Sequence, residues 1–143
     1  MSASTPNLTE PAQAFVDILD PLKGLTAYLW ERENFDQLPA AAVGVPVFKR
    51  HGPDEAESQL HTLDWILEYP ISFYLDLTNA YSDQQKMVEG LQAIAVALDT
   101  DPSLGGTVFD AAITEGTPFV EEGRARPLTG YQITVAALKL VEL

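Results

Sequence analysis

The clearest pattern of apolar and polar positions lies between residues 71 and 98. Apolar residues at 71, 73, 75 and 77 alternate with more polar ones, and this period of two predicts a strand with one buried face. Ser82 and Gln85 have the spacing of a capping box, so we expect a helix that begins at Ser82. Its apolar stripe at helical spacing comprises Met87, Val88, Leu91, Ile94, Ala95 and Leu98. A strand that leads directly into such a helix predicts a helix folded back over the sheet.

A second helical pattern covers residues 11–33. Its apolar positions form a broad face, but Pro21 and Gly24 interrupt it, so we expect a break or kink near Asp20. Residues 1–10 are rich in Ser, Thr, Pro and Asn, and we expect them to form a flexible N-terminal arm.

A strand signal comes from three valines. Val43, Val45 and Val47 alternate with other residues, one of which is Pro46. Proline has no backbone N–H, so it cannot donate a hydrogen bond to a neighbouring strand. We therefore predict that this strand lies at an edge of the sheet.

Three further segments complete the expected sheet. Residues 60–68 read as a strand, and Pro70 separates it from the strand at 71–78 by either a bulge or a tight turn. Residues 107–114 and 130–143 also alternate as strands, while 115–128 are too long and polar for a tight hairpin turn.

The order of these elements defines the fold class. Strands occur in runs and do not alternate strictly with helices, which favours an α+β fold. We predict a mostly antiparallel sheet of four or five strands with two helices packed on one face. The length of 143 residues fits a single domain over residues 11–143.

Composition narrows the classes of protein. There are 21 acidic and 8 basic residues, a formal net charge of −13, which disfavours binding along the phosphates of nucleic acid. The chain has no cysteine, so it has no disulfides or thiolate metal ligands. No apolar run approaches the roughly 20 residues of a membrane span, and residues 1–10 do not resemble a secretion signal.

Candidate catalytic chemistry is sparse. His51 and His61 lie ten residues apart without a metal-binding spacing such as HxH or HExxH, and no phosphate-binding glycine loop or nucleophile elbow is present. Pairs of carboxylates are expected by chance in so acidic a chain, and we interpret them as solvated. We therefore expect no enzyme, no metal site and no cofactor.

Two charged segments are candidates for contact with partners. One is the acidic loop that contains Asp54, Glu55 and Glu57. The other carries Arg124 and Arg126, which either dock on an acidic neighbour or pair with the glutamates of their own loop. Together with the valine strand, these segments are the predicted interaction surfaces.

The most specific signal lies between residues 97 and 141. It combines a helix that ends in L-x-x-D-P-x-L-G-G-x-V with a closing strand of the form R-P-L-x-G-x-x-I-T-V. This arrangement resembles the tail terminator proteins of long-tailed (siphovirus-type) bacteriophages. The residues that carry the resemblance are Leu98, Asp101, Pro102, Leu104, Gly105, Gly106, Val108, Arg126, Pro127, Leu128, Gly130, Ile133, Thr134 and Val135.

The resemblance implies a structural role in the virion. Such proteins form a hexameric ring, here a homohexamer, that caps the tail tube, fixes its length and presents a surface to the head–tail connector or stopper protein. The implied partners are further copies of the chain and the tail tube protein, with genome DNA passing through the ring without specific binding. The implied location is the head–tail junction of the virion, after assembly in the host cytoplasm.

Other functions remain open at this level. A neighbouring head–tail connector, neck or tail completion protein has a related α+β design. A small cytosolic ligand-binding domain would require an apolar pocket with convergent polar groups. A carboxylate-metal hydrolase would require several acids at one site.

Overall fold

The computed structural model describes residues 7–22, 24–32, 35, 37–50, 62–76, 80–121 and 128–142. Its helices are α1 (Thr9–Leu19) and α2 (Ala80–Thr100). Its strands are β1 (Thr26–Leu29), β2 (Ala40–Val43), β3 (Val47–Arg50), β4 (Thr62–Asp76), β5 (Asp110–Glu121) and β6 (Leu128–Glu142).

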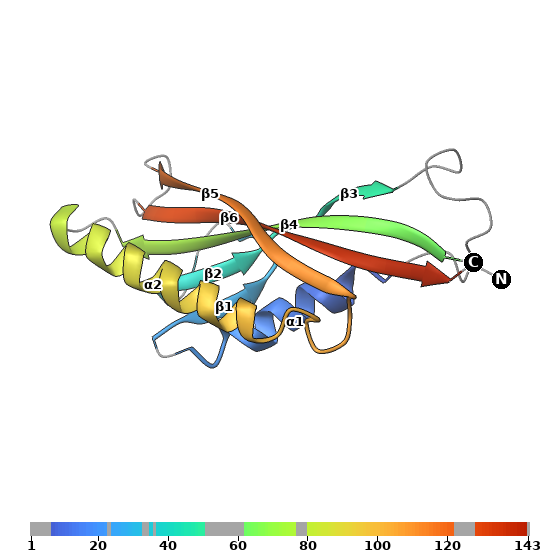
Figure 1. Cartoon of the computed structure of the whole chain (residues 1–143). Helices are drawn as coiled ribbons and strands as arrows, with labels where there is room; N and C mark the ends of the chain where they lie inside the picture. The colour runs from blue at the N-terminus through green and yellow to red at the C-terminus, as the bar shows by residue number, and fades with distance from the viewer. Residues whose placement is uncertain are drawn as a thin grey trace.

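The strands form one sheet in the order β1-β2-β4-β6-β5, and β3 pairs with β4 beyond the end of β2 (Figure 1). Only β1 and β2 run parallel among the described pairs, and every other pair is antiparallel. The predicted α+β class with a mostly antiparallel sheet is confirmed. The predicted number of strands is wrong, because the described residues form six strands and not four or five.

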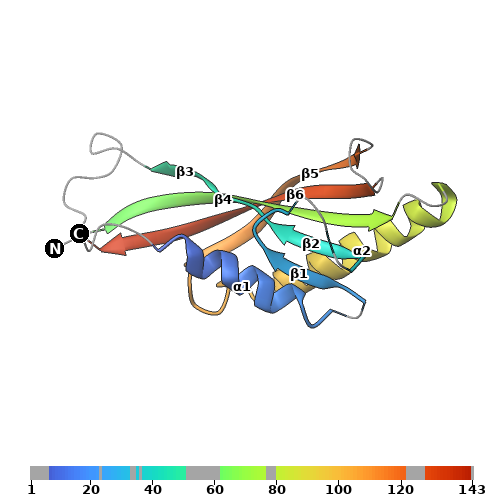
Figure 2. The ribbon, with the colours of Figure 1, turned by 180° about the vertical axis from the view of Figure 1, so that it is seen from behind.

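Both helices cover one face of the sheet (Figures 1 and 2). Alternate residues of β4 and β6 point at them, and the resulting core unites Phe15 of α1 with Ile94 of α2. Phe15 meets the buried ring of Tyr69 edge-on, with 5.2 Å between ring centroids. The Tyr69 hydroxyl donates a 2.6 Å hydrogen bond to the carbonyl oxygen of Leu8, which fixes the start of α1 to the sheet. Neither of the two described helices lies on the opposite face, here called the outer face.

The predicted helix over 11–33 is correct only in its first half. Helix α1 begins at Thr9, inside the expected arm, and ends at Leu19, next to the expected break. Thr26–Leu29 is a strand that pairs in parallel with β2. Four residues are too few to separate the helical period from the strand period, so the partner strand decides the conformation.

Strand β4 continues straight through Pro70, which resolves the alternatives of a bulge and a turn. The carbonyl oxygen of Pro70 accepts a 2.7 Å hydrogen bond from the Gly44 amide. The N–H and C=O groups of one strand residue point toward the same edge of the strand. Since the Pro70 carbonyl points at Gly44, the place of the missing Pro70 N–H also faces the gap between β2 and β3. Proline is tolerated in this long strand because no ladder hydrogen bond is due there.

Helix α2 begins at Ala80, so the predicted capping role of Ser82 is wrong. The predicted stripe is mostly correct: Met87, Ile94 and Leu98 are buried, whereas Val88 is 52% exposed. Strand β5 starts at Asp110 and extends to Glu121, into the segment that was predicted to be loop.

Candidate functional site

The motif that carries the resemblance folds into a tight turn after α2, here called the motif turn (101–108). The Asp101 carboxylate organises it: Oδ2 accepts a 2.8 Å hydrogen bond from the Gly105 amide, and Oδ1 accepts one of 3.0 Å from the Ser103 hydroxyl. Gly105 and Gly106 have φ of 68° and 85°, a region that glycine enters without steric cost. The acid and the glycines of the motif are therefore explained by backbone geometry.

The apolar residues of the motif attach this turn to the core. Leu98, Leu104 and Val108 are at most 7% exposed and belong to the main hydrophobic cluster. Two contacts with β6 complete the attachment: Lys139 Nζ donates to the Thr107 carbonyl at 2.6 Å, and the Phe109 amide donates to the Leu138 carbonyl at 2.8 Å. The turn thus fixes where β5 begins along β6.

The three valines do not form one edge strand, so that prediction is wrong in part. Val43 ends β2 and is fully buried, because β1 pairs with β2 and closes that side. Val45 lies between strands and is 73% exposed, and Val47 opens β3 and is 62% exposed. The described pairing of β3 is with β4 alone, so the edge is displaced to residues 47–50.

Strand β3 combines exposed apolar and basic side chains. Phe48 is 54% exposed, and its ring lies 5.0 Å from that of Trp65. Lys49 Nζ lies 3.0 Å from Glu68 Oε1, but 69% of the lysine side chain is accessible to solvent. Val45, Val47, Phe48 and Lys49 are here called the β3 surface.

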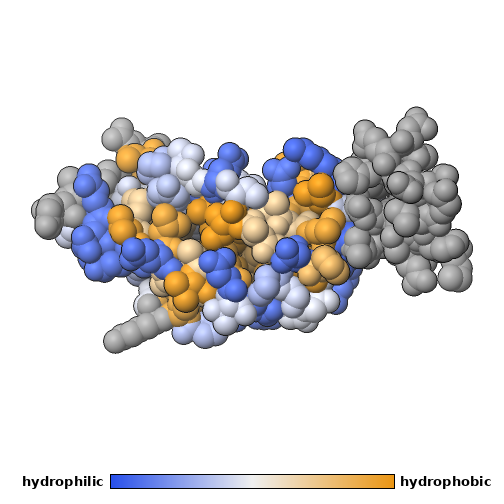
Figure 3. Space-filling view, viewed as in Figure 1, coloured by the Kyte–Doolittle hydropathy of each residue, from blue (hydrophilic) through white to orange (hydrophobic). Residues whose placement is uncertain are grey.

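Strand β5 lies at the opposite edge of the sheet and pairs only with β6 among the described strands. Most of its residues are exposed, including Val120 at 56%, and the preceding Phe109 is 68% exposed. Figure 3 shows apolar residues gathered on the face that carries β5 and α2. Phe109, Val120 and the acidic residues Asp110, Glu115 and Glu121 are here called the β5 surface.

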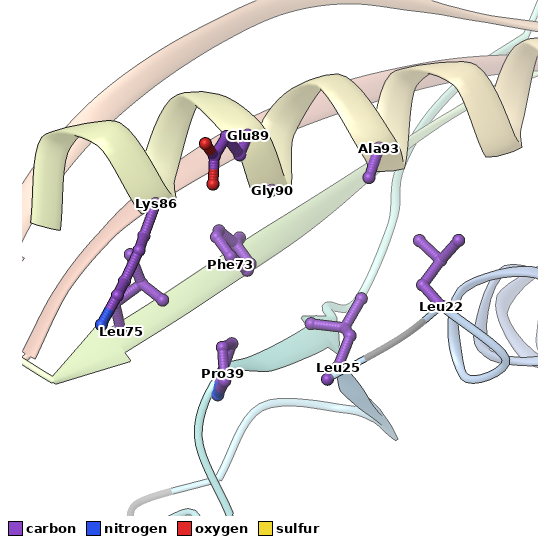
Figure 4. A pocket seen from close by; sticks show the side chains of 10 residues that line it. Leu22, Leu25, Pro39, Phe73, Leu75, Lys86, Glu89, Gly90 and Ala93 are labelled. Carbon is purple, nitrogen blue, oxygen red and sulfur yellow. The ribbon is translucent and has the colours of Figure 1, made fainter. Parts of the chain in front are cut away.

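A small hollow of about 240 Å³ lies between α2, the end of α1 and the sheet (Figure 4). Its walls are mainly apolar, with Lys86 and Glu89 of α2 as the charged residues. Gly90 of α2 and Phe73 of β4 line the hollow and lie so close together that any side chain at Gly90 would overlap the Phe73 ring. Its volume lies below the roughly 300 Å³ at which ligand pockets begin, so it gives weak support to a ligand-binding domain.

A shallower hollow of about 500 Å³ lies on the outer face. The Tyr74 hydroxyl donates to Glu31 Oε2 at 2.7 Å there. Burial raises the pKa of Tyr74 above its ordinary value, and the hydrogen bond to Glu31 raises the pKa further. The Arg32 guanidinium lies 4.4 Å from the centre of the Tyr28 ring. The polar groups of this hollow thus make contacts within the chain that stabilise the outer face.

Several predicted residues lie outside the described residues. They are His51, Asp54, Glu55, Glu57, His61, Arg124 and Arg126. Within the described ranges, no three His, Asp or Glu side chains are grouped so as to hold a metal ion. Sequence reasoning found the first half of β5 in the predicted strand at 107–114, but assigned its second half, up to Glu121, to a loop.

No family model matches the chain, and no curated protein matches it significantly. In the described part of the chain, neither helix has the length and hydropathy needed to cross a membrane.

Proposed function

We propose that this protein is a tail terminator: a structural ring protein, hexameric by the resemblance, that caps a phage tail tube. One face of the ring would contact the tail tube protein, and the other would contact the head–tail connector. The observation that carries the proposal is the motif turn. Of the residues in this turn on which the resemblance rests, Leu104 and Val108 are buried, Gly105 and Gly106 adopt a positive φ, and Asp101 accepts hydrogen bonds that shape the turn, while Pro102 is exposed.

The two edges of the sheet support assembly. The β3 and β5 surfaces both expose apolar side chains, and open strand edges present unpaired backbone groups to a neighbouring chain. A ring built from one kind of subunit needs two such surfaces on each copy.

The charge of −13 fits a channel through which DNA slides. An acidic wall repels phosphates, so DNA passes without adhering. Changing Asp54, Glu55 and Glu57 together to lysine should slow genome ejection in virions. Ejection at the wild-type rate would remove this part of the proposal.

The deciding experiment is electron microscopy of particles assembled without this gene product. Headless tails of uncontrolled length are expected, because loss of the cap explains both defects. Tails of normal length that fail to join heads would instead identify a connector or neck protein next to the terminator. Normal virions would refute a role in the tail.

A further inference from the structure

Phe109 is the most exposed aromatic residue in the described part of the chain. It directly follows the motif turn and is 68% exposed. Phe48, the other exposed aromatic residue among those described, already packs against the ring of Trp65, whereas no described ring packs against Phe109. Single exposed apolar side chains are common on protein surfaces, so Phe109 is informative only together with a site that would accept its ring.

The hollow beside α2 is such a site. Phe73 and Leu75 of β4 line it beneath the helix, and its volume is about 240 Å³ (Figure 4). An apolar cavity of about 150 Å³ is large enough to bind benzene, so this hollow has room for one phenyl ring, although it is small for a complete ligand. Its rim on α2 is exposed at Lys86, Glu89 and Ala93, so the hollow is reached from the surface.

The structure keeps Phe109 away from the hollow of its own chain. Residues 86–93 of α2 line the hollow, whereas Phe109 follows the turn beyond the C-terminal end of the helix at Thr100 (Figure 1). Since an α-helix rises 1.5 Å per residue, Gly90 and Thr100 lie about 15 Å apart along the axis. A ring that enters this hollow would therefore come from a second molecule.

We propose that Phe109 of one copy inserts into the hollow beside α2 of a second copy. The charges at the two sites are complementary: Asp110 follows Phe109 in the chain, and Lys86 lines the hollow. Neither Lys86 nor Asp110 forms an ion pair within the described structure. Insertion of the ring would place an exposed carboxylate next to an exposed ammonium group.

The acids near Lys86 already have contacts within the chain. Glu89 accepts a 3.0 Å hydrogen bond from the side-chain amide of Gln85. Asp76 and Asp83, which line a smaller neighbouring hollow together with Lys86, also have interactions of their own. Lys86 is thus the charged group of this rim that is left to meet a neighbouring molecule.

The proposed contact joins two different surfaces of the chain. Each copy offers both Phe109 and a hollow, so the contact is heterologous and generates a closed ring or an open filament. This inference deepens the proposed function and rests on it for its biological setting, because it names one contact between the subunits of the ring.

The absence of cysteine allows a direct test with the full-length chain. Glu89→Cys places a thiol at the rim of the hollow, and Ala112→Cys places one on the exposed part of β5, three residues after Phe109. The two variants are mixed and treated with a short bismaleimide cross-linker. We expect a covalent dimer at a yield at least about threefold above that of either variant alone. A mixture of Ala112→Cys with Gln13→Cys, on the exposed side of α1, controls for random collision.

Changes at the ring and at the hollow test the insertion itself. Adding Phe109→Ala to the Ala112→Cys partner should lower the cross-linked yield about tenfold, because the buried aromatic ring would carry most of the contact. Adding Ala93→Phe to the Glu89→Cys partner fills the hollow and should lower the yield equally. Val96→Ala in that partner removes an apolar side chain that is 66% exposed but does not line the hollow, and it should leave the yield unchanged. A yield no greater than in the Gln13→Cys control, or one that is insensitive to Phe109→Ala, would overturn the inference.

Charge reversal tests the electrostatic part. Adding Lys86→Glu to the Glu89→Cys partner should lower the yield about threefold, because a surface attraction becomes a repulsion. Adding Asp110→Lys to the Ala112→Cys partner should then restore it. A yield that ignores both changes would contradict the pairing of these two residues.

The cross-linking result and the particles assembled without this gene product separate the two proposals. Cross-linking that depends on Phe109, together with normal virions, would support the contact and refute the tail terminator role. Headless tails of uncontrolled length, together with cross-linking at the control level, would support the role and refute this contact.

Discussion

Replacing Asp101 with alanine tests whether the motif turn is a structural element. The change removes the acceptors of two hydrogen bonds, from the Gly105 amide and from the Ser103 hydroxyl. At about 1 kcal/mol for each hydrogen bond, the free energy of unfolding should fall by about 2 kcal/mol. For a domain of this size, the midpoint of thermal unfolding should fall by about 6 °C. Urea unfolding and a thermal scan, both followed by circular dichroism, measure these quantities.

A matched control removes the effect of charge. Asp99 and Asp101 both lie at the C-terminal end of α2, where the helix dipole disfavours negative charge. Asp99→Ala therefore loses the same charge near the same dipole, and we expect it to be neutral or stabilising by a few tenths of a kcal/mol. Asp101→Asn keeps an oxygen that can accept from the Gly105 amide, so its loss should be about 1 kcal/mol or less.

The order of the three variants in free energy of unfolding shows whether the Asp101 carboxylate holds the turn. Equal stabilities of Asp101→Ala and Asp99→Ala would refute the assignment of the turn to the Asp101 carboxylate. A destabilised Asp101→Asn that matches Asp101→Ala would show that the charge matters and the acceptor geometry does not.

Three other predictions follow from backbone geometry and burial. Gly130→Ala should lower the free energy of unfolding by more than about 2 kcal/mol, because the new carbon overlaps the Phe73 carbonyl oxygen and the Phe119 ring. Denaturant titration measures this free energy. An unchanged value would contradict the close packing around Gly130. Gly105→Ala should cost about 1 kcal/mol through its positive φ alone, since nothing lies within 4 Å of the added carbon; an asparagine there should lose less in the same titration. Burial raises the folded-state pKa of Tyr69 and Tyr74 above 10.0, so these tyrosines ionise first in the unfolded chain. Their contribution to the free energy of unfolding should therefore be full below pH 10.0 and should fall as the pH rises further. In unfolding experiments, a variant with both tyrosines changed to phenylalanine should show a shallower fall.

Local sequence determined the elements whose signals lie within a few residues. The apolar spacing from Met87 to Leu98 predicted the buried face of α2, and the alternation from Ile71 predicted the direction of the side chains of β4. The motif turn was also predictable as a stop and turn, because the hydrogen bonds between its own residues join positions at most five apart.

Only tertiary structure decided the edges of the sheet. Thr26–Leu29 becomes a strand because β2 offers a partner, and that pairing buries Val43, which the sequence assigned to an edge. The opposite charges of Lys49 and Asp110 were visible in the sequence, but their place at the two ends of one cross-strand row was not. Strand pairing joins residues far apart in the chain, so the sequence determined which segments could be strands, and the assembled sheet decided which of them remained exposed.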